Sequence, residues 1–181
     1  MRTIYIFTTM MVSGWMASVS ADSLNEAIAD QVDAVTERVV AWRRDIHANP
    51  ELSNREFRTS ALVAEHLRSL GIDVQTGVAH TGVVGVLKGG KPGPVIALRA
   101  DMDGLPVTEK TGLPYASTVR GEYQGREVGV MHACGHDNHV AILMGAAEVL
   151  AAVKRICRVR LNFSFSLLRK GRPRAETGAR R

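Results

Sequence analysis

Chemically reactive side chains gather in one short stretch, MHACGHDNH, which covers residues 131–139. Within it, Cys134, His136 and His139 supply a thiol and two imidazoles. With a carboxylate nearby, these groups suit a divalent ion such as Zn, Mn, Co or Ni. A free cysteine in a core, beside histidines on a polar helix start, would explain the same residues. The spacing alone therefore leaves a metal site and a structural role open.

Asp101 and Asp103 form a second candidate group. They follow the apolar run PVIALR, residues 94–99, which is typical of a strand buried in a mostly parallel sheet. Open α/β sheets bind their ligands at the carboxyl ends of such strands. Residues two apart in an extended chain project to the same side, so both carboxylates can face one centre. A solvated loop or a helix cap is the alternative interpretation.

The elements that must position these groups follow from the pattern of apolar residues. Helical spacing runs from Ser23 to a stop at Pro50, and a second helix, capped by Thr59 or Ser60, ends at Gly71. A last, apolar helix begins just after Asp137 or Asn138. Short β-rich runs lie between the second and last helices, at residues 72–78, 81–89 and 94–104. This order predicts an α/β fold with a mostly parallel central sheet.

Residues 1–21 have the layout of a secretory signal peptide. One arginine precedes an apolar stretch, and Val19-Ser20-Ala21 resembles a cleavage site. We therefore expect a secreted or periplasmic protein that has no stable association with a membrane after cleavage. An uncleaved anchor is the alternative.

Charge is distributed unevenly along the 181 residues. The net charge is +5, but residues 155–181 hold nine basic residues and one acidic residue. Such a tail could bind nucleic acid or a membrane. It has no helical charge face, so we expect no nucleic-acid partner.

Three segments resemble one known family when they are taken together. RRDIHANPELSNREFRTS, ALRADMDGLPV and VMHACGHDNHVA occur in the order found in metal-dependent amidohydrolases of the aminoacylase/carboxypeptidase superfamily. This group includes hippurate hydrolase, N-acyl-amino-acid amidohydrolase and indole-acetyl-amino-acid hydrolase. The resemblance covers about residues 35–154. It implies that residues 22–154 form the N-terminal part of a catalytic di-metal domain, which is incomplete here.

The resemblance also implies roles for individual residues. Cys134 and His136 would be metal ligands, with Cys134 bridging two divalent ions. Asp103 matches the position that orients a ligand histidine, whereas Asp101 falls where distant members carry that histidine. His139 and His47 would support the ligands without binding metal. The expected substrate is an N-acyl amino acid or a related amide, and full-length relatives are expected to form homodimers.

The family's catalytic base is missing from the printed sequence. It is a glutamate in a QPAEEG motif downstream, and residues 155–181 contain no such motif. Codons permitted for residues 165–171, read in a shifted frame, can encode Gln-Pro-Ala-Glu-Glu-Gly. Codons for residues 154–159 can likewise encode Glu-Asp-Leu-Pro-Gly. We therefore predict a frameshift near Lys154 and an out-of-frame tail at residues 155–181.

The functional expectation combines these observations. The parent activity is metal-dependent hydrolysis of the amide bond of N-acyl amino acids by metal-activated water. Without the glutamate base and the remaining ligands, the truncated chain is expected to be inactive. A non-catalytic metal-binding fragment is the alternative. Half a sheet should also leave an unpaired strand edge and an uncovered apolar face.

Overall fold

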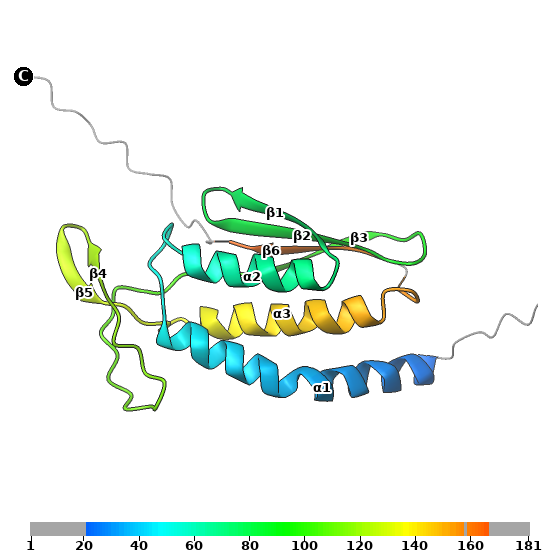
Figure 1. Cartoon of the computed structure of the whole chain (residues 1–181), viewed down its shortest axis with the longest axis horizontal. Helices are drawn as coiled ribbons and strands as arrows, with labels where there is room; N and C mark the ends of the chain where they lie inside the picture. The colour runs from blue at the N-terminus through cyan, green and yellow to red at the C-terminus, as the bar shows by residue number, and fades with distance from the viewer. Residues whose placement is uncertain (1–20, 158, 167–181) are drawn as a thin grey trace, which may run out of the picture.

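The structure, a computed structural model, describes residues 21–157 and 159–166, with side chains from residue 24 onward. Helices α2 and α3 cover one face of a four-stranded sheet, and α1 packs against α3 on the side away from the sheet (Figure 1). This arrangement confirms the α/β class. The elements are α1 (Ala21–Ala48), α2 (Phe57–Ser69), β1 (Asp73–Val78), β2 (Gly82–Lys88), β3 (Val95–Ala100), β4 (Arg120–Tyr123), β5 (Arg126–Gly129), α3 (His136–Ala152) and β6 (Arg160–Phe165).

The four-stranded sheet is mixed rather than mostly parallel. Its strand order is β1-β2-β6-β3, and β4 and β5 form a separate hairpin. The β1–β2 and β2–β6 pairs are antiparallel, and only β3–β6 is parallel. A short turn joins β1 to β2 and forces them to run in opposite directions, whereas α3 forms the crossover that lets β3 and β6 run together.

Strand β6 lies in the interior of the sheet, although the sequence assigned its residues to a tail. Leu161, Phe163 and Phe165 alternate along the strand and are at most 4% exposed. Alternate apolar residues are the signature of a strand that covers a core on one face. Residues 160–165 thus lie in the sheet, within the segment 155–181 that the sequence assigned to an out-of-frame tail. The basic residues around them concealed this signal. The reading frame of that segment stays a prediction.

Strand β3 was expected to be buried, and that expectation is wrong for the part of the chain described. β3 has β6 on one side and lies at the edge of the sheet. Val95 is consequently 59% exposed and Ile96 43% exposed. The predicted unpaired edge is present at this strand.

Helix starts differ from their predicted positions. Helix α2 begins at Phe57 rather than after Thr59, because the Glu51 carboxylate accepts the N–H groups of Arg58 and Thr59, each at 2.8 Å. Its end is as predicted, with Gly71 in the left-handed region at φ +70°.

Helix α3 begins at His136, before the two residues expected to cap it. Gly135, at φ +79°, occupies the N-cap position. Asp137 therefore lies inside the first turn, and its carboxylate is free to bind groups from other elements.

The predicted signal peptide lies outside the described residues, apart from Ala21, which is the first residue of α1. None of the described helices combines the length and apolar character needed to cross a membrane.

Candidate metal centre

His136 lies where the end of β3 meets the start of α3. The positive φ of Gly135 turns the chain into the helix and presents the imidazole of His136 to the residues that follow β3. Nδ1 of His136 lies 2.9 Å from Oδ1 of Asp103 and 3.0 Å from the backbone oxygen of the same residue. Both partners are acceptors, so Nδ1 carries the proton and Nε2 keeps its lone pair. This is the tautomer that a metal-binding histidine needs.

Asp103 is itself fixed in position. Asp103 is only 6% exposed, and the Ser53 hydroxyl donates to its second carboxylate oxygen at 2.7 Å. The geometry agrees with the prediction that Asp103 orients a ligand histidine.

Three residues place their donor atoms within 4.8 Å of one another: Asp101, His136 and His139. Asp101 follows the last residue of β3 and also accepts a hydrogen bond from Arg99 at 2.9 Å. The rings of His136 and His139, one turn apart on α3, have centroids separated by 5.3 Å. The structure thus assembles two histidines and both predicted aspartates, from segments more than thirty residues apart in the sequence.

Cys134 and His47 are placed differently. Cys134 is exposed and lies two residues before His136, but it does not belong to the three-residue group. Its role as a bridging ligand stays a prediction. His47 is buried away from this group, between Asp137 and Glu109.

The surroundings of His47 could not be predicted from the sequence. Glu109 lies in the irregular segment between β3 and β4, where no periodicity marks it. In the sequence, Arg43 is not distinguished from the other basic residues on α1. Its guanidinium Nε in fact donates to Asp137 at 2.8 Å.

His132 is a further buried histidine near this region. It is 3% exposed, and within the described part of the chain neither ring nitrogen has a hydrogen-bond partner. Burial has the largest effect on its pKa and lowers it, as do His47 and His136. Asp137 and Asp103 act in the opposite direction, and the net result is a pKa of about 4. The ring is therefore neutral at neutral pH.

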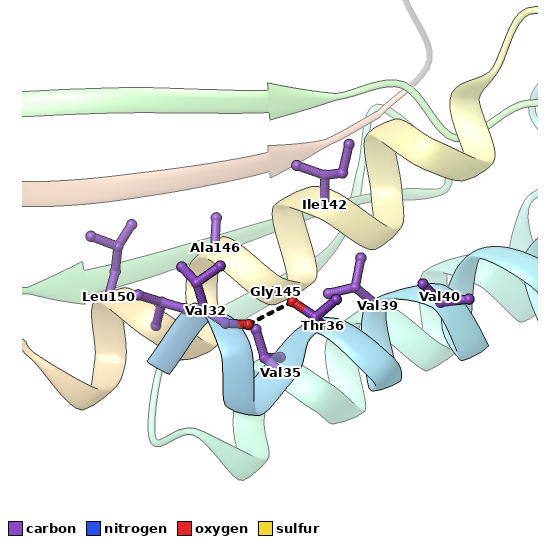
Figure 2. A pocket seen from close by; sticks show the side chains of 10 residues that line it. Val32, Val35, Thr36, Val39, Val40, Ile142, Gly145, Ala146 and Leu150 are labelled. Atoms are coloured by element: carbon purple, nitrogen blue, oxygen red, sulfur yellow. Dashed lines mark hydrogen bonds between the residues drawn. The ribbon is translucent and has the colours of Figure 1, made fainter. Parts of the chain in front are cut away.

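An apolar groove lies elsewhere and does not carry the chemistry. It has a volume of about 380 Å³ and lies between α1 and α3, and Figure 2 shows aliphatic side chains along both helices. Its one hydroxyl group, on Thr36, donates to the backbone oxygen of Val32 at 2.7 Å. Ile142 on its rim is 61% exposed. Because the groove lies between two helices, it is a different surface from the uncovered face of the sheet that the sequence predicted.

The fold and this residue group together place a candidate metal site in an α/β domain. Comparison with known proteins shows which family the chain resembles. The family model described as Peptidase family M20/M25/M40 matches residues 97–166. Thermostable carboxypeptidase 2 of Saccharolobus solfataricus is 46% identical over 143 residues, which are 78% of this chain and 34% of that protein.

Two further relatives are an amidohydrolase and a metal-binding peptidase. The N-acyl-L-amino acid amidohydrolase of Geobacillus stearothermophilus is 41% identical, over 77% of this chain and 36% of its own length. The structure of the Bacillus subtilis YXEP protein, a dinuclear metal-binding peptidase from the M20 family, superposes with a TM-score of 0.65 and 39% identity. That superposition covers 74% of this chain and 35% of YXEP.

In both sequence and fold the chain is similar to the M20-type metallopeptidases and amidohydrolases, as the resemblance predicted. It spans about a third of the length of these relatives. The match to the family continues to residue 166 in the printed reading frame. The predicted change of frame near Lys154 stays a prediction.

Proposed function

We propose that this chain carries part of the metal centre of an amidohydrolase that cleaves the amide bond of N-acyl amino acids. The observation that carries the proposal is the group of Asp101, His136 and His139, together with the hydrogen bond from His136 to Asp103. The Geobacillus stearothermophilus relative, an N-acyl-L-amino acid amidohydrolase, supports this substrate class.

The residues present fit a divalent ion. They offer imidazole nitrogens and a carboxylate oxygen, with the Cys134 thiol nearby, and this donor set suits Zn, Mn, Co or Ni. YXEP is a dinuclear metal-binding protein, and on that ground we propose two divalent ions in the complete enzyme. Cys134 is then the proposed bridging ligand.

Each residue has a separate task in this proposal. Bound divalent ions would supply a water of lowered pKa and would polarise the amide carbonyl. His136 offers Nε2 as a ligand because Asp103 holds the proton on Nδ1. Asp101 contributes a negative oxygen at the same position. The QPAEEG glutamate that would serve as the base is not in the printed sequence, so we propose that this chain does not turn over substrate.

Metal binding by the purified 181-residue chain tests the first half of the proposal. Calorimetric titration with Mn²⁺ and Zn²⁺ should show stoichiometric binding, which His136→Ala should weaken at least tenfold. His80→Ala is the matched control, because His80 is exposed and lies on the turn between β1 and β2. Equal affinity of wild type and His136→Ala would refute the proposed centre.

The reading frame of the gene tests the second half of the proposal, which is that this chain does not turn over substrate. The family match extends to residue 166, and β6 ends at Phe165. The shifted codons for Gln-Pro-Ala-Glu-Glu-Gly begin at Phe165. We therefore propose that the frame changes at Phe165–Ser166. Sequencing the locus tests this proposal. Restoring the shifted frame from Ser166 onward should yield a chain that hydrolyses N-acetyl amino acids and loses activity with a chelator.

A non-catalytic metal-binding fragment is the second candidate. The exposed β3 edge and the uncovered groove favour it, because both indicate that the described part is an incomplete domain. Metal binding by the 181-residue chain without turnover, together with a locus that lacks the shifted motif, would establish it. We also propose that the complete enzyme is exported from the cytoplasm and forms a dimer.

A further inference from the structure

A buried cluster of ionisable side chains lies beside the proposed metal centre but is not part of it. His47, in the last turn of α1, places Nδ1 2.8 Å from Oδ2 of Asp137 and Nε2 3.1 Å from Oε1 of Glu109. Arg43, one turn earlier, donates to the same oxygen of Asp137 at 2.8 Å and to the Tyr115 hydroxyl at 3.0 Å. The side chains of His47, Asp137 and Glu109 are at most 4% exposed.

Both carboxylates in this cluster have more than one partner. Burial raises the pKa of Glu109, but hydrogen bonds from the Thr111 hydroxyl, the Ser117 backbone N–H and His47 outweigh it and lower the pKa overall. Asp137 accepts from the Arg43 guanidinium and also lies beside His47.

His47 lies between the two carboxylates. Each of its ring nitrogens is within hydrogen-bond distance of one of them. A buried polar group that loses its partner is costly, so both carboxylates depend on His47 for a contact.

The cluster joins three segments at the metal centre. Asp137 directly follows His136 in the first turn of α3, while Glu109 belongs to the segment that leads from Asp103 to β4. His47 connects both of these to α1. Loss of His47 would leave two buried carboxylates without a shared partner, and the first turn of α3 would have to move.

We propose that His47 is a positioning residue that fixes the first turn of α3 and thereby the orientation of His136. Its importance for metal binding rests on the proposed function, whereas its effect on His136 does not. The charged and titratable groups that face it are Asp137 on α3, Arg43 on α1, Glu109 and Tyr115 before β4, and His132, whose ring centroid is 6.5 Å away.

Nitrogen NMR of the metal-free 181-residue chain, labelled with ¹⁵N-histidine, tests the proposal without activity. His47→Gln should shift the ring signals of His136 in the metal-free chain and should weaken Mn²⁺ or Zn²⁺ binding about tenfold or more. His80→Gln, an exposed histidine, should do neither. Unchanged His136 signals in a folded His47→Gln chain would refute positioning, whatever the metal affinity. Shifted signals in a chain that binds no metal would instead refute only the proposed function.

Discussion

Strand β6 provides the strictest test of the fold, because its residues lie in the segment that the sequence assigned to an out-of-frame tail. Phe163 is fully buried in the middle of the strand, paired with Gly85 of β2 on one side and Leu98 of β3 on the other. Phe163→Ala removes a benzyl group from a packed core, and such changes destabilise proteins by about 3–5 kcal/mol. A domain of this size has a stability of about 5–15 kcal/mol, so the loss should be easily measured.

Urea unfolding of the 181-residue chain, followed by circular dichroism, is the appropriate assay. Phe163→Ala should move the midpoint to much lower urea, and Phe163→Leu should cost less than about 1.5 kcal/mol. Arg160→Ala is the matched control, since Arg160 lies on the same strand and its side chain is exposed. It should change stability by no more than about 0.5 kcal/mol. If Phe163→Ala and Arg160→Ala had the same midpoint, β6 would not belong to the core.

Three other perturbations have defined outcomes. Glu51→Ala removes the acceptor for the first N–H groups of α2 and should destabilise the chain by about 1–2 kcal/mol in the same assay. Gly145→Ala would place a Cβ 2.6 Å from Cγ2 of Val39, where α1 and α3 approach closely, and should cost about 1–3 kcal/mol; a variant as stable as wild type would contradict that contact. For His132, the pKa falls from 6.5 in the unfolded chain to about 4 in the folded one, so the unfolded state takes up the proton first. The metal-free chain should therefore lose about 3 kcal/mol as the pH falls from about 6.5 to about 4. His132→Asn should reduce this loss, and equal pH profiles would show that His132 is not buried as a neutral ring.

The sequence was sufficient for those features that depend on neighbouring residues. The three helices were identified because helical periodicity is local, and Gly71 was identified as a helix end because a left-handed residue favours glycine. The convergence of Asp101 and Asp103 on one centre followed from the two-residue period of an extended chain. His136 stood out because the residues around it resemble a family motif.

The sequence failed where a distant partner decides the outcome. Asp137 has the identity and position of a helix cap, yet its carboxylate binds His47 and Arg43, which lie about ninety residues earlier in the chain. Strand β6 was concealed because its basic neighbours dominate the composition, whereas its burial depends on pairing with β2 and β3.

The sequence by itself determined the three helices, the resemblance to a family and the reactive residues, because these follow from local pattern and residue identity. Only the tertiary structure decided which of those residues meet. It brought Asp101 to His136 and His139, and it enclosed His47 between two carboxylates. The physical reason is that a hydrogen bond or a metal site depends on distances across the fold, and no spacing along the chain specifies them.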